Sequence, residues 1–204
     1  MKTISRIRLR ARLSLRNLAS DCSGVAATEF AVIVPIMLVM FFGTVEFSSG
    51  VAVDRKVTLV ARTLSDLTSQ STSVADIDVT NFFTASGKIL TPYVPTPTQA
   101  KISELYVDPT TLQARVQWSK SATLSSSGSV TLASGRAVSS TVAIPSALAI
   151  AGTYLIFSEV SYQYVPTIGY VMVPTGVNLS DVSYTRPRQS TCVYYSPATA
   201  CTTL

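Results

Sequence analysis

The sequence predicts an α+β protein in which an N-terminal transmembrane and stalk α-helix precedes a small domain with an antiparallel β-sheet. Two observations support this. Residues 30–47 form an apolar run whose only charge is Glu46, and the alternating runs that suit β-strands all lie after residue 100. With 204 residues and 47% hydrophobic content, the chain has room for one modest domain besides the helix.

The apolar run predicts a helix that crosses a membrane. At about 1.5 Å per residue, a helix over residues 25–53 would cross a hydrocarbon core of roughly 30 Å. Apolar residues then recur with heptad-like spacing at Val53, Val57, Val60, Leu64 and Leu67. We expect the helix to continue to residue 70 with this stripe packed on the protein's own domain, a coiled coil being the alternative. The Ser-rich segment 69–73 should end the helix.

Basic charge is confined to residues 1–24, and this predicts the orientation of the helix. Six basic side chains and one acid lie there, whereas residues 25–204 hold ten of each, so the net charge of +5 belongs to the N-terminal segment. By the positive-inside bias, residues 1–24 form a cytoplasmic leader and the domain, residues 71–204, lies across the membrane. Contact with membrane lipid explains this charge better than nucleic-acid binding, because the rest of the chain has no basic patch.

The domain should combine a short helix with antiparallel strands. Residues 74–90 suit a helix that stops at Gly87. Alternating residues predict a hairpin over 102–118 with its turn at 108–111, and 153–165 carries the strongest strand signal in the chain.

The remaining segments of the domain carry weaker signals. Residues 119–136 are rich in Ser, Gly and Thr, and we expect a mobile connection with at most a weak strand at 130–132. Other short strands are expected over 137–144, 169–173 and 182–184. Seven of the nine tyrosines lie after residue 150; we expect them to pack on the sheet, an aromatic interaction surface being the alternative.

The three cysteines divide into one in the leader and two near the C-terminus. Cys22 precedes the helix, whereas Cys192 and Cys201 have eight residues between them. In an oxidising compartment these two would close a disulfide, and two free thiols are the alternative.

The residues for common catalytic chemistry are missing from this sequence. The chain has no histidine, which excludes histidine-based catalysis and histidine metal ligands. It also lacks the glycine-rich phosphate loops and the GxSxG nucleophile elbow. We therefore predict no enzyme, no catalytic residue, no metal and no cofactor.

The start of the helix resembles the processing site of type IV prepilins. The residues that carry this resemblance are Gly24-Val-Ala-Ala-Thr-Glu29-Phe30. The longer segment, with Pro35, Gly43 and Val45-Glu46-Phe47, is similar to the TadE-like pseudopilins of the tight-adherence (Flp) pilus system. Agreement continues in residues 158–166 and 184–188, whereas residues 70–145 carry no matching motif.

This resemblance implies a pilin-like fold and a set of site residues. A prepilin peptidase would cut between Gly24 and Val25. Glu29, beside Phe30, would then pair with the terminal amine of a neighbouring subunit. Independently of the resemblance, Glu46 lies near the outer end of the helix, where we expect its side chain to reach the headgroups or to pair with Arg55 or Lys56 of a neighbour.

The same resemblance implies a role in Flp pilus assembly. The chain would be a minor subunit or an assembly and initiation component of a pilus involved in adhesion. Its partners would be the prepilin peptidase, other pilins or pseudopilins and the pilus assembly machinery. It would span the bacterial inner membrane once, with its domain in the periplasm, and could enter a surface pilus.

Alternatives to this interpretation remain open at the sequence level. A secretory signal would be cut near Gly43 or Ser49, and a plain anchor would not be cut at all. An uncleaved helix would suit an envelope binding protein or adhesin. The motifs also do not separate TadE-like proteins from the related TadF and TadG proteins.

Overall fold

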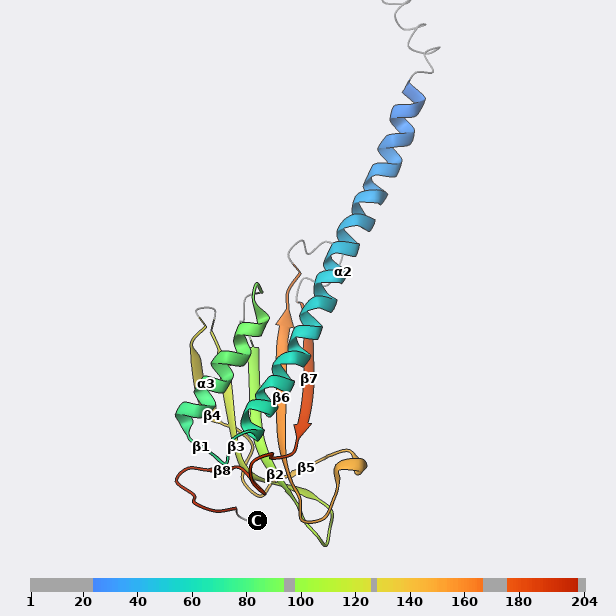
Figure 1. Ribbon diagram of the computed structural model, residues 1–204. Helices are drawn as coiled ribbons and strands as arrows, with labels where there is room; N and C mark the ends of the chain where they lie inside the picture. Colours follow the sequence, from blue (N-terminus) through green and yellow to red (C-terminus); the bar gives the residue numbers. More distant parts are fainter. Residues whose placement is uncertain (1–23, 94–97, 126–127, 167–175, 202–204) are drawn as a thin grey trace, which may run out of the picture. The chain divides into compact units, whose positions relative to one another are not determined.

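The computed structural model describes residues 24–93, 98–125, 128–166 and 176–201. The described residues form the expected α+β architecture, in which the long apolar helix α2 (Val25–Ser69) is followed by a domain with an antiparallel sheet (Figure 1). The chain divides into two compact units, residues 1–45 and 46–204. The division falls within α2, so the second unit includes the helix from Glu46 onward. The expected leader, except Gly24, lies outside the described residues.

Helix α2 confirms the predicted apolar helix over its whole length. It begins at Val25, contains Pro35 and runs for 45 residues to Ser69. Its length and apolar composition are sufficient for it to cross a membrane, and no residue of the most apolar stretch is buried. In this respect the helix fits a single-pass membrane anchor.

The sheet of the second unit is wholly antiparallel. Its main strands follow the order β4-β3-β2-β6-β7. Strand β4 pairs with the end of β3, and β5 pairs with the start of β3. The strands are β2 (Thr98–Val107), β3 (Ala114–Leu124), β4 (Val130–Ser134), β5 (Thr141–Val142), β6 (Tyr154–Tyr164) and β7 (Val177–Thr185). A separate parallel pair joins β1 (Ser73–Val74) to β8 (Tyr194–Tyr195), and the short helices are α3 (Asp76–Gly87), η2 (Lys88–Leu90) and η3 (Ser146–Leu148).

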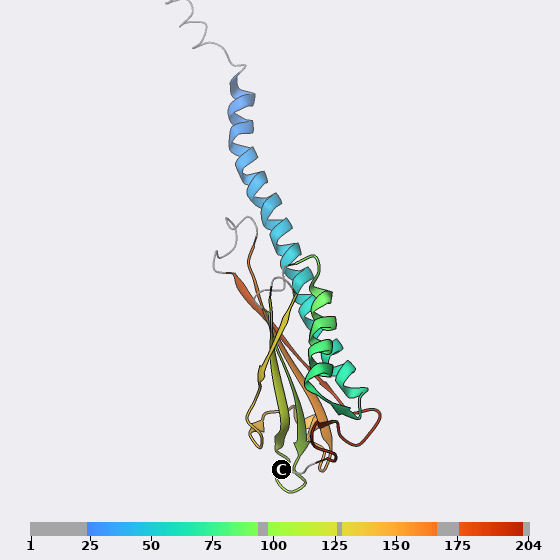
Figure 2. The same cartoon turned by 90° about the vertical axis from the view of Figure 1, so that its left-hand side faces the viewer.

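Helices α2 and α3 cover one face of the sheet, where the main core lies (Figure 2). The heptad-like residues of α2 from Val53 to Leu64 are buried in this core, and Phe83 of α3 joins them. The hydroxyl of Ser158 in β6 also donates a hydrogen bond of 2.6 Å to the carbonyl of Ala61. The stripe therefore packs on the protein's own domain, as expected.

A bulge in β3 allows a second core to form on the opposite face of the sheet. Glu104 pairs with Trp118 and Leu105 with Val116, so Gln117 is the extra residue. Because of it, Val116 and Trp118 face opposite sides although they are two residues apart. Val116 belongs to the second core, which the segment with β5 and η3 covers through Ile144 and Leu148. Among the described residues, no other helix or strand covers the rest of this face.

The predicted short helix, the hairpin and the strand over 153–165 are all confirmed as α3, β2–β3 and β6. The expected mobile connection over 119–136 is wrong, because β3 continues to Leu124 and β4 spans Val130–Ser134. The strand expected over 137–144 shrinks to β5, and the one at 182–184 lengthens to β7. The strand expected at 169–173 lies outside the described residues.

Candidate processing and docking site

The peptide bond between Gly24 and Val25 lies at the first turn of α2. Both residues are exposed, and α2 begins at Val25. A Cβ added at Gly24 would find no heavy atom within 4 Å. Packing within the described part of the chain therefore does not require a glycine here.

Glu29 and Phe30 are exposed one turn further along α2, and the Phe30 side chain is 68% exposed. Residues four apart in a helix lie on the same face, so Glu29 lies above Val25. A cut after Gly24 would therefore place an ammonium group and a carboxylate on one face, both accessible to a neighbouring subunit.

Glu46 has a different environment from Glu29, since it is only 3% exposed within the second unit. Tyr164 of β6 lies close by: burial raises the pKa of the Tyr164 phenol, a hydrogen bond with Ser49 lowers it, and the charge of Glu46 raises it. Lys56 donates hydrogen bonds of 2.8 Å to the carbonyls of Ile89 and Thr91, so it is engaged within its own chain. Of the two acids, Glu29 is thus the one open to a partner.

A disulfide joins Cys192 and Cys201, whose Cα atoms are 5.9 Å apart. Both the backbone N–H and the backbone carbonyl of the adjoining Val193 are hydrogen-bonded to side chains of the sheet. Its N–H donates a 2.5 Å hydrogen bond to Glu104 Oε1, and its carbonyl accepts a 2.6 Å hydrogen bond from Trp118 Nε1. The disulfide therefore closes the C-terminal loop, and hydrogen bonds with the buried Glu104 and Trp118 side chains hold the loop to the sheet.

Glu104 is the site residue that the sequence analysis missed. Its side chain is buried in the central strand β2, and burial raises its pKa to about 8 although the hydrogen bond from Val193 opposes the shift. One signal was present in the sequence: Glu104 continues the even-numbered positions of Ala100 and Ile102, which face the main core. The partner 89 residues away in the chain could not be inferred from that alternation.

A second polar cluster holds β8 against α3. Lys120 Nζ lies 2.9 Å from the carboxylate of Asp76 and 4.8 Å from the centre of the Tyr195 ring, and the Tyr195 hydroxyl also bonds to Asp76. These hydrogen bonds lower the pKa of Asp76. At the start of α3, the Asp78 side chain accepts a 2.9 Å hydrogen bond from the N–H of Ala75, the residue before the helix.

Four of the tyrosines after residue 150 pack on the sheet, as expected. Tyr154, Tyr162 and Tyr164 of β6 are all buried. Tyr184 of β7 stacks on Phe157, with ring centres 4.6 Å apart. Tyr170 lies outside the described residues.

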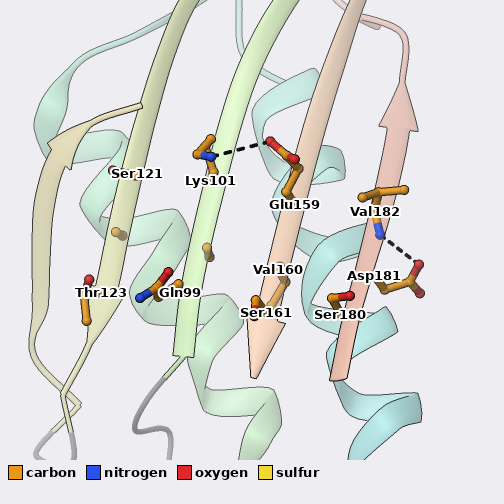
Figure 3. A pocket seen from close by; sticks show the side chains of 12 residues that line it. Gln99, Lys101, Ser121, Thr123, Glu159, Val160, Ser161, Ser180, Asp181 and Val182 are labelled. Atoms are coloured by element: carbon orange, nitrogen blue, oxygen red, sulfur yellow. Dashed lines mark hydrogen bonds and ion pairs between the residues drawn. The ribbon is translucent and has the colours of Figure 1, made fainter. Parts of the chain in front are cut away.

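The open face of the sheet carries a shallow polar hollow of about 440 Å³ between β3, β2, β6 and β7. Figure 3 shows Lys101 beside Glu159, 3.8 Å apart, while Ser161 and Ser180 come from adjacent strands. Arg136 also pairs with Glu159, at 2.7 Å. Among the described residues no group of three or more acidic, histidine or cysteine side chains could hold a metal ion.

Comparison with known proteins supports the sequence resemblance. The model of the TadE-like protein family matches residues 24–64. No curated protein and no solved structure matches the chain. The matched segment begins at Gly24 and covers most of α2, including its apolar part and most of the stripe buried in the domain. The resemblance to TadE-like proteins is therefore confirmed over residues 24–64, and it suggests association with the Tad pilus.

Proposed function

We propose that this chain is a TadE-like pseudopilin that acts as a minor subunit or an assembly and initiation component of a Flp-type pilus. It is anchored by α2 in the bacterial inner membrane, with residues 1–24 in the cytoplasm and the domain in the periplasm. A prepilin peptidase cuts between Gly24 and Val25. The mature chain then docks with other pilins or pseudopilins and the pilus machinery, and serves adhesion.

One observation carries this proposal: the family match and α2 begin together at the expected cut. The match starts at Gly24 and the helix at Val25, both exposed. Removal of residues 1–24 would leave a helix whose first residue bears a free amine. The disulfide between Cys192 and Cys201 is compatible with the oxidising periplasm.

Replacing Gly24 with leucine should abolish processing. We expect the wild-type chain, extracted from membranes, to begin at Val25, while Gly24→Leu keeps the leader because the peptidase no longer accepts the residue before the cut. Intact mass and N-terminal sequencing measure this directly. In the wild type, reduction should also add the mass of two hydrogen atoms, from the Cys192–Cys201 disulfide.

The control for this experiment is Ala27→Ser, which changes a small residue after the cut and should leave processing intact. A wild-type chain that still carries residues 2–24 would contradict the proposal. The uncleaved envelope binding protein or adhesin would then be the better interpretation, and the polar hollow on the sheet is the observation that favours it.

Replacing Glu29 with glutamine should prevent assembly without preventing the cut. Removing one partner of a desolvated charge pair costs about 3–5 kcal/mol, which is enough to lose docking between subunits. Surface pili recovered by shearing should disappear, while the intact mass still shows a chain that begins at Val25.

Thr28→Ala is the matched control for Glu29→Gln. It removes the neighbouring hydroxyl, which donates a 2.8 Å hydrogen bond to the Val25 carbonyl, but no charge. Normal pilus yield with Glu29→Gln would exclude Glu29 as the docking carboxylate. That result would not bear on the proposed cut between Gly24 and Val25.

A further inference from the structure

A buried acid shows that the domain extends to the membrane end of α2. Twenty residues cross a hydrocarbon core of about 30 Å, and counted from Phe30 they end at Ser49. Glu46 lies within this count, yet it is only 3% exposed because the second unit covers it. Tyr164, at the end of β6, bonds to Ser49 and senses the charge of Glu46. This end of the domain therefore lies at the depth of the membrane surface.

An apolar groove opens at the same level. It has a volume of about 210 Å³ and is formed by about two turns of α2, from Phe47 to Asp54, on one side and by the ends of β6 and β7 on the other. Its lining is almost entirely apolar and consists of Phe47, Gly50, Val51, Asp54, Tyr164, Val177 and Leu179. We call this the juxtamembrane groove. Its volume is smaller than the roughly 300–1,000 Å³ of pockets that enclose whole ligands, so the groove suits only a part of a long, narrow ligand.

Exposed apolar side chains surround the groove. Phe47 is 66% exposed and Val165 56%, and Val51 and Val177 are also exposed. Burying apolar surface stabilises by about 25 cal/mol per Å², so such a cluster is unfavourable in water. The only charged residue of the lining, Asp54, lies on α2 one turn beyond Gly50, on the side away from the membrane.

The chemistry of the groove favours a hydrocarbon chain over a peptide. A peptide segment would bring backbone N–H and C=O groups that need hydrogen-bond partners. The groove offers few, because its lining is apolar apart from Asp54 and the Tyr164 hydroxyl, which is already bonded to Ser49. An acyl chain has no such groups, and acyl chains are present where α2 leaves the membrane.

We propose that the juxtamembrane groove takes an acyl chain of a phospholipid from the leaflet on the domain's side, which seats this edge of the domain in the membrane. The inference depends on the membrane span of α2 but on neither cleavage nor the pilus role.

Tryptophan variants of the full-length protein in dilute vesicles test this proposal. Val177→Trp places an indole in the groove, and Val182→Trp is the matched control on the same strand, lining the polar hollow. Phe41→Trp reports on insertion of α2. Each variant also contains the native Trp118, whose fluorescence is measured in the unaltered protein and subtracted. In phosphatidylcholine with brominated acyl chains, the introduced tryptophan should be quenched as strongly at position 177 as at position 41. The tryptophan at position 182 should not be quenched.

Photolabelling of the unaltered chain provides a second measurement. A phospholipid with a diazirine in its acyl chain should label residues 164–165 and 177–179 in addition to α2, whereas residues 180–185 stay unlabelled. Quenching at position 41 without quenching or labelling near 177 would overturn the proposal while leaving the span intact. No quenching at position 41 would overturn the span and the proposal together. If position 177 is not quenched by the brominated lipid and its fluorescence changes only at a high protein-to-lipid ratio, a second copy of the chain is the occupant. That result would also overturn the proposal.

Discussion

Replacing Glu104 with glutamine should remove a loss of stability that we expect in the wild-type protein as the pH rises from 4.5 to about 8. Burial raises the Glu104 pKa from 4.5 to about 8, so between these values the folded chain holds a proton that the unfolded chain has released. The free energy of unfolding then falls as pH rises, by up to about 1.4 kcal/mol per pH unit from this group. Glutamine keeps an oxygen that accepts from Val193 but does not titrate.

The measurement is denaturant unfolding of the full-length protein in detergent micelles at pH 5, 6.5 and 8. Trp118, the only tryptophan, lies in this region and reports on it. We expect Glu104→Gln to be the more stable protein at pH 8, with little dependence on pH over this range. Glu159→Gln is the control, because Glu159 is a surface partner of Arg136 and its loss should leave the slope intact. If the free energy of unfolding of Glu104→Gln falls with pH as steeply as that of the wild type, a group other than Glu104 causes the pH dependence.

Replacing Leu64 with alanine should destabilise the domain by about 2–5 kcal/mol, because it removes a fully buried side chain from the contact between α2 and the sheet. Leu59→Ala makes the same change on the same helix at a side chain that is 49% exposed, and it should cost much less. Both variants change helix propensity equally, so the difference between them measures packing alone. Unfolding followed by Trp118 fluorescence gives both values.

This pair also tests the role of the last part of α2. Equal losses for Leu64→Ala and Leu59→Ala would mean that the heptad-like stripe does not pack on the sheet in solution. The coiled-coil alternative would then regain support. The expected inequality would show that the helix and the sheet unfold as one domain.

Local periodicity in the sequence was sufficient for the elements whose signals repeat. The apolar run and the stripe from Val53 to Leu64 specified α2 and its buried face, and alternation specified the β2–β3 hairpin and β6. The roles expected for Gly24, Val25 and Glu29 rest instead on the resemblance of this segment to a prepilin processing site. The structure places them at the start of α2 but does not decide their roles.

Pairing across the sheet decided the segments that composition described wrongly. Residues 119–124 read as a loop because serine and threonine favour turns, yet β3 lies between β2 and β4 in this region, and both neighbours satisfy its backbone. The buried Ser119 hydroxyl lies 2.8 Å from that of Ser103 and accepts a 2.9 Å hydrogen bond from the Arg136 N–H. Long-range partners thus outweighed local propensity.

The sequence by itself therefore determined the long apolar helix, its buried stripe, the strongest strands and the pair of cysteines, because each depends on spacing within one short segment. Only the tertiary structure decided that Glu46 is buried, that Glu104 anchors Val193, and that α2 and the ends of β6 and β7 enclose an apolar groove. Those features join residues about 90 to 130 positions apart, and their physics depends on burial and register, which no local pattern encodes.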